Sequence, residues 1–104
     1  MNKAYLKKLV DEATEIDPQN EVLLERNRQE RLKEMAENLE DTISYLESCA
    51  EIELLWATEV LEDLSEIFKS KKLIQCVENG VKRCLDPQAK KQLNMTLDYM
   101  RKHV

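Results

Sequence analysis

Side chains that act as nucleophiles, bases or metal ligands are few in this sequence. It holds one histidine, His103, and three cysteines, Cys49, Cys76 and Cys84. His103 is the penultimate residue, and a fraying chain end cannot hold a catalytic base in a fixed geometry. The cysteines form no CxxC pair, and Cys76, Cys84 and His103 do not have the spacing of a tetrahedral zinc site. We therefore expect no enzymatic activity, no resident metal and no cofactor.

Paired carboxylates offer the one catalytic alternative. Glu37-x-x-Glu40 and Glu59-x-x-Glu62 lie on segments expected to form facing helices. This spacing resembles the ExxE…ExxD magnesium-binding pattern of the all-α nucleotide pyrophosphohydrolases. The resemblance implies oxygen ligands for Mg²⁺ and hydrolysis of a nucleotide. Glu62 stands where that family has Asp, and residues 35–68 contain no basic side chain to meet a triphosphate.

Charge is divided unevenly along the chain. The net charge is −5, yet residues 35–68 carry ten acidic and no basic side chains, and residues 69–104 carry nine basic and three acidic ones. Four carboxylates recur at helical spacing: Glu59, Glu62, Asp63 and Glu66. Like charges at this spacing destabilise an isolated helix, so a cationic partner that neutralises them would explain their grouping. The alternative is that the basic helices that follow balance them within the fold.

The basic C-terminal third does not predict a nucleic-acid site. No aromatic residues interleave with its lysines, the whole chain is acidic, and no helix-turn-helix is visible. The longest apolar run, Leu54–Ala57, is far too short to cross a membrane. The first ten residues lack the apolar core of a signal peptide. Together with unpaired cysteines among apolar neighbours, these features predict a cytoplasmic protein.

The elements that position these residues are expected to be helices in one domain, residues 1–104. Gly occurs once and Pro twice in 104 residues, which excludes folds built on many tight turns. Apolar periodicity predicts helices over residues 3–16, 18–48, 49–68 and 71–85, and a last one after Asp86-Pro87. The breaks are placed at Ser48 and at residues 69–72. The prediction is an all-α, four- or five-helix antiparallel bundle with a long second helix and a central third helix.

The central helix, residues 49–68, carries two apolar stripes. The first continues a heptad-like seam that starts at Leu32, and the second comprises Ile52, Trp56, Val60 and Ile67. Two apolar faces predict packing on two sides and a buried Trp56. The segment Glu25–Arg31 is the opposite, because it has no apolar residue on any face.

Three functions remain open. The first is a small acidic protein-binding module, of inhibitor, immunity or adaptor/chaperone type, that docks a basic surface of a partner protein through the four carboxylates. The second is a structural homodimer held by the heptad-like seam. The third is the magnesium-dependent nucleotide pyrophosphohydrolase.

Overall fold

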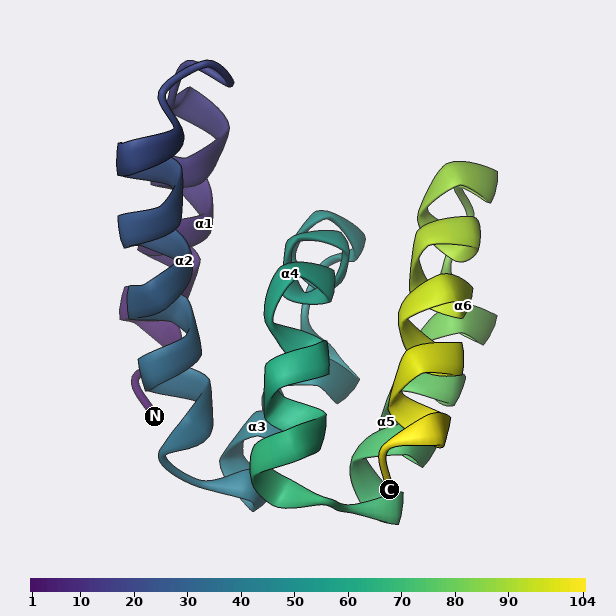
Figure 1. Cartoon of the computed structure of the whole chain (residues 1–104). Helices are drawn as coiled ribbons and strands as arrows, with labels where there is room; N and C mark the ends of the chain where they lie inside the picture. The colour runs from purple at the N-terminus through teal and green to yellow at the C-terminus, as the bar shows by residue number, and fades with distance from the viewer.

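Six helices and no strands make up the chain. A computed structural model describes all residues, 1–104. Its helices are α1 (Lys3–Glu15), α2 (Glu21–Ala36), α3 (Leu39–Ser48), α4 (Glu51–Phe68), α5 (Lys71–Arg83) and α6 (Pro87–Lys102). In Figure 1, α1 and α2 form a pair at one side, α5 and α6 form a pair at the other, and α4 lies between them with α3 behind it. The all-α class is confirmed, and the helix count is six rather than four or five.

The extra helix arises at Asn38. The predicted long second helix stops at Ala36, and Asn38 adopts an extended backbone before α3 begins. The Asn38 side chain accepts the main-chain N–H of Asp41 at 3.0 Å and so satisfies one of the unpaired donors of the new helix. Thr42 closes the corner by donating its hydroxyl to the Met35 carbonyl at 2.6 Å. The central helix is therefore the fourth, not the third.

Another asparagine begins α2. The Asp17-Pro18 pair predicts a helix start at that point, but the helix begins at Glu21 with Asn20 as its N-cap. Asn20 accepts the N–H of Leu23 at 3.1 Å. Asp17 instead accepts the N–H of Gln19 at 2.9 Å, in a turn before the helix. The second Asp-Pro start is confirmed, since α6 begins at Pro87 with Asp86 as its cap.

The predicted break near Ser48 is confirmed. Helix α3 ends at Ser48, whose hydroxyl donates back to the Ser44 carbonyl at 3.0 Å. The N-cap of α4 is Ala50, and the Glu53 carboxylate accepts the Ala50 N–H at 3.0 Å. The break at residues 69–72 is also confirmed. Lys69 adopts the left-handed conformation there, with φ 46°, and Ser70 caps α5.

The core is built around α4. Val60, Leu61 and Leu64 are completely buried, and residues from all the other helices pack into the same cluster. Most of the heptad-like seam therefore contacts this chain's own helices. Gly80 lets α5 approach α4 closely, because a Cβ atom at that position would lie 3.0 Å from a methyl of Leu54. Asn79-Gly80 does not end α5, which continues to Arg83.

Candidate functional site

Helix α4 turns one face to the core and the other outward between α2 and α6. The outward residues, called the α4 face below, are Ile52, Leu55, Trp56, Glu59, Glu62, Asp63, Glu66 and Ile67. Helical spacing sorts them by chemistry along the axis, with the apolar members mainly in the first turns and the four carboxylates after them. The four carboxylates predicted to bind a partner therefore lie on one surface, together with apolar residues that include Trp56, for which the sequence predicts burial.

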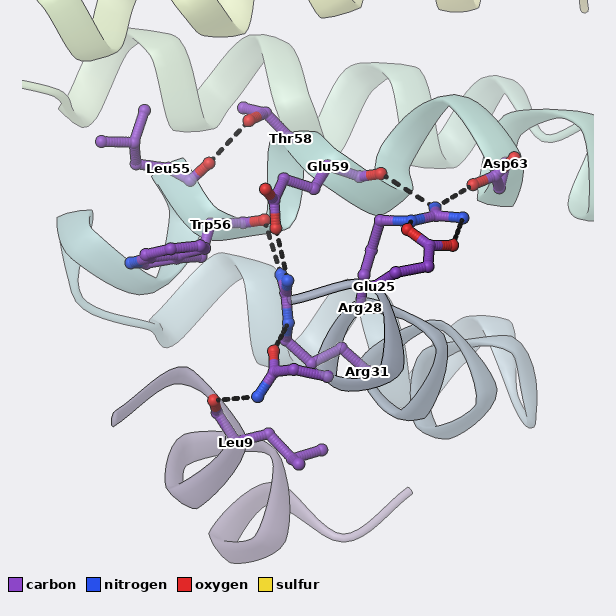
Figure 2. Close-up of polar contacts among 10 residues, drawn as sticks. Leu9, Glu25, Arg28, Arg31, Leu55, Trp56, Thr58, Glu59 and Asp63 are labelled. Atoms are coloured by element: carbon purple, nitrogen blue, oxygen red, sulfur yellow. Dashed lines mark hydrogen bonds and ion pairs between the residues drawn. The ribbon is translucent and has the colours of Figure 1, made fainter. Parts of the chain in front are cut away.

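Arg31 of α2 fixes the middle of this face. Its side chain is only 2% exposed, and it forms an ion pair with the Glu59 carboxylate. It also donates to the carbonyl of Trp56 at 3.0 Å and to the side-chain oxygen of Asn27 at 2.7 Å. Asn27 in turn donates to the carbonyl of Leu9 at 2.8 Å, so one chain of polar contacts joins α1, α2 and α4 (Figure 2). Each of the three guanidinium nitrogens therefore donates to an acceptor, which avoids the free-energy cost of burying an unpaired N–H group.

Arg28, one helical turn before Arg31, makes a second link between α2 and α4. It pairs with Asp63 at 2.7 Å and with Glu25 at 3.0 Å, as Figure 2 shows. It also reaches the main-chain carbonyl of Glu59 at 3.3 Å. Hydrogen bonds from Arg28 and then from Gln29 lower the pKa of Glu25 to about 2. Glu25 is therefore ionised throughout the physiological range.

The remaining two carboxylates are not paired with a cation. Glu66 accepts the hydroxyl of Tyr99 in α6 at 2.7 Å, and this hydrogen bond is the main reason that the pKa of Tyr99 is raised. Glu62 is exposed and makes no hydrogen bond or ion pair with the rest of the chain. The basic residues at 69–72 do not pair with any of the four carboxylates, so the internal partners are the α2 arginines instead.

A groove runs between the start of α4 and the start of α6. It encloses about 450 Å³ and is lined by Ile52, Leu55, Trp56, Thr58, Glu59, Gln88 and Gln92. Trp56 is only half-buried, because on this side polar Gln88 and Gln92 lie opposite it instead of apolar residues. Trp56 is thus partly exposed rather than fully buried as predicted, and of the second apolar stripe only Val60 is fully covered. The groove provides an apolar floor beside the carboxylates.

The proposed magnesium pattern is not assembled. Glu37 lies after the end of α2 and Glu40 lies in the first turn of α3, so the two do not share a helix. Glu37 instead pairs with the main-chain amino group of Met1 at 3.3 Å. Glu59 is occupied by Arg31. No three His, Cys, Asp or Glu side chains gather closely enough to hold a metal ion.

The cysteines and the histidine take structural positions. All three cysteines are free thiols, and burial raises the pKa of Cys49 and Cys76 to about 11. Thiols with pKa values this high stay protonated at neutral pH and react slowly. His103 lies at the end of α6, with its ring 4.2 Å from that of Tyr99.

Comparison with protein families, with characterised proteins and with solved structures finds no match to this chain. No helix combines the length and the hydropathy that crossing a bilayer requires. We therefore infer the candidate site from its geometry alone.

Sequence reasoning found the carboxylates but missed Asn27, Arg28 and Arg31. The available signal was the segment Glu25–Arg31 itself. A helical segment without an apolar face, placed between helices that have one, must pack against them through polar side chains. Arg28 and Arg31, three residues apart, lie on one face of this segment.

Proposed function

We propose that this protein is a small protein-binding module whose α4 face docks a basic surface of a partner protein. The observation that carries the proposal is the arrangement of this face: an apolar groove that continues directly into four carboxylates. Glu59 and Asp63 keep 43% and 42% of their side chains exposed even though each is paired with an arginine. Glu62 and Glu66 have no cationic partner, so a basic surface has free charges to meet.

The two arginines support this role because they hold the face in a fixed shape. Arg28 and Arg31 bind both main-chain carbonyls and carboxylates of α4, so the helix cannot slide along α2 without breaking several bonds. A surface held in its binding geometry loses less conformational entropy on association. The carboxylates beside the apolar groove also raise the association rate with a cationic partner.

The experiment is capture of partners from the native host with three forms of the protein. The test variant is Glu62→Lys with Glu66→Lys, which reverses the two carboxylates that no arginine engages. The control is Glu12→Lys with Glu15→Lys, the same charge change on exposed positions of α1. We expect one partner to bind wild type and the control and to be lost with the test variant. A partner retained by the test variant would contradict docking on this face.

A further inference from the structure

One stripe of α6 borders the apolar part of the α4 face. Gln88 and Gln92 line the groove, and Met95 and Tyr99 follow at the same helical spacing, so all four lie on one stripe of α6 beside the buried face of that helix. Met95 is 59% exposed and Ile52 is 52% exposed, so both side chains are accessible to an occupant of the groove. The groove thus has its apolar side chains on the α4 wall and polar Gln88 and Gln92 on the α6 wall, with exposed Met95 further along α6.

The charges lie at a defined distance from this groove. Leu55 and Glu62 are separated by seven residues of one helix, or about 10 Å, and Leu55 and Glu66 by about 16 Å. Glu66 is placed beside α6 by its bond to Tyr99, so the carboxylates continue the line of the groove rather than turning away from it. An occupant that fills the groove therefore meets negative charge two to three helical turns further along.

We propose that the groove binds an amphipathic helical segment of a basic partner protein, with one large apolar side chain over Leu55 and Trp56 and lysines or arginines over Glu62 and Glu66. This inference rests on the proposed function and adds the chemistry of the partner. On a helix laid along the groove, the cations fall roughly seven and eleven residues from the anchor, since these positions share one face. An apolar helix face in a groove with flanking charge pairs is a common recognition mode.

The negative charge of Glu62 and Glu66 argues against nucleic acids, anionic lipids and a second copy of this chain as occupants of the groove. The phosphates of nucleic acids and of anionic lipids carry the same sign as Glu62 and Glu66. In a two-fold dimer through this face, each copy presents only its own apolar and acidic halves, so neither half supplies cations to the other. A separate basic segment is the occupant that neutralises the face.

The sole tryptophan of the chain, Trp56, reports on the groove. The probe is a tryptophan-free synthetic helix of about 15 residues, long enough for partial helicity. It has one leucine, and lysines roughly seven and eleven residues after it. The first control peptide replaces the leucine by alanine at equal charge. The second moves both lysines to the opposite face of the helix.

We expect the leucine peptide to shift Trp56 emission to shorter wavelength and to bind about 10- to 100-fold more tightly than the alanine peptide, the ratio that burial of one leucine side chain provides. The displaced-lysine peptide should bind more weakly as well. Ile52→Lys should abolish the emission shift, and circular dichroism should show that its fold is intact because Ile52 is half-exposed.

Equal affinity for the leucine and alanine peptides, or unchanged Trp56 emission on binding, would overturn the inference. A dimer in the absence of peptide that Ile52→Lys converts to monomer would overturn it in favour of a second copy of this chain. These results differ from failure of the proposed function, because loss of partner capture with Glu62→Lys and Glu66→Lys depends on charge alone. Retained capture with that variant would remove the proposed function and this inference together.

Discussion

The Arg31 guanidinium lies over the ring of Trp56, 5.4 Å from the ring centroid, and donates to the main-chain carbonyl of the same residue at 3.0 Å. One buried cation therefore holds both the backbone and the aromatic side chain at the middle of the α4 face. Because the contact is largely removed from water, the attraction between cation and ring is stronger than at an exposed site. This contact connects the stability of the helix pair α2–α4 to the shape of the groove.

Arg31→Ala should lower the free energy of unfolding by about 2–4 kcal/mol. The change removes three hydrogen bonds and leaves buried acceptors, including Asn27, without their donor. Arg26→Ala is the control, since Arg26 is exposed and makes no ion pair, and its effect should stay within about 0.5 kcal/mol. Urea unfolding measures both. Equal effects of the two variants would mean that the Arg31 contacts contribute nothing specific.

Trp56→Ala should cost about 1–2 kcal/mol, and Leu61→Ala about 2–5 kcal/mol. The larger residue has the smaller effect because Trp56 is partly exposed beside the groove, whereas Leu61 is completely buried. The full burial that the sequence predicts for Trp56 would instead give a loss of about 3–5 kcal/mol. Unfolding measurements that rank Trp56 above Leu61 would show that the groove is closed in solution.

The Glu51 carboxylate should make stability depend on pH. It accepts the main-chain N–H groups of Leu85 at 2.6 Å and Asp86 at 3.2 Å, and these bonds lower the pKa of Glu51. A lowered folded-state pKa means that the ionised form stabilises the fold above the ordinary pKa of Glu and that this contribution is lost as pH falls through the folded value.

Glu51→Gln should therefore lower the urea midpoint at neutral pH, and the difference from wild type should shrink in acid. Glu12→Gln is the matched control, because Glu12 is exposed and accepts no hydrogen bond. A difference between Glu51→Gln and wild type that is constant across the acid range would mean that ionisation of Glu51 has no part in its effect.

Lys69→Gly should stabilise the protein by about 0.5–1 kcal/mol. Lys69 ends α4 in the left-handed conformation, with φ 46° and ψ 50°, where a Cβ atom is unfavourable and glycine is not. Its N–H still donates to the Ser65 carbonyl at 2.9 Å, and glycine keeps this bond. A rise in thermal midpoint is expected. A fall would show that the Lys69 side chain contributes more than its backbone strain costs.

Much of the fold was readable from the sequence, and the missed break has a clear cause. Helical class followed from the scarcity of glycine and proline, and the start at Asp86-Pro87 followed from capping chemistry. The interruption between α2 and α3 was missed because Glu37 keeps helical dihedral angles and only Asn38 is extended. The apolar residues from Leu32 to Ile43 keep helical spacing in the sequence across Asn38, so the periodicity carries no sign of the break.

The candidate site was readable only in part. The carboxylates were visible because they are consecutive on one helix. Their arginine partners lie 35 and 28 residues earlier in the chain, in the segment Glu25–Arg31, which contains no apolar residue. The partial exposure of Trp56 depends on Gln88 and Gln92 of α6, which line the groove with it. Contacts between distant segments decide both features, and local patterns do not contain them.

Asp63 is unsuitable for testing the docking proposal by charge reversal. A lysine at that position would face Arg28, which now lies 2.7 Å from the carboxylate, so stability would fall whatever the partner does. Glu62 and Glu66 avoid this conflict because neither is paired with a cation. Thermal unfolding of the Glu62→Lys and Glu66→Lys double variant should accordingly stay close to that of wild type.

The most direct measurement of the central claim is the affinity of the captured partner at low and at physiological ionic strength, for wild type, for the Glu62→Lys and Glu66→Lys variant and for the Glu12→Lys and Glu15→Lys control. Docking of a basic partner on the α4 face predicts that wild type and control bind alike and weaken together as salt rises. It also predicts that the Glu62 and Glu66 variant binds about 10-fold or more weakly at low salt, since charges within about 8–10 Å are no longer complementary. Equal affinity of all three forms at both salt concentrations would contradict the account.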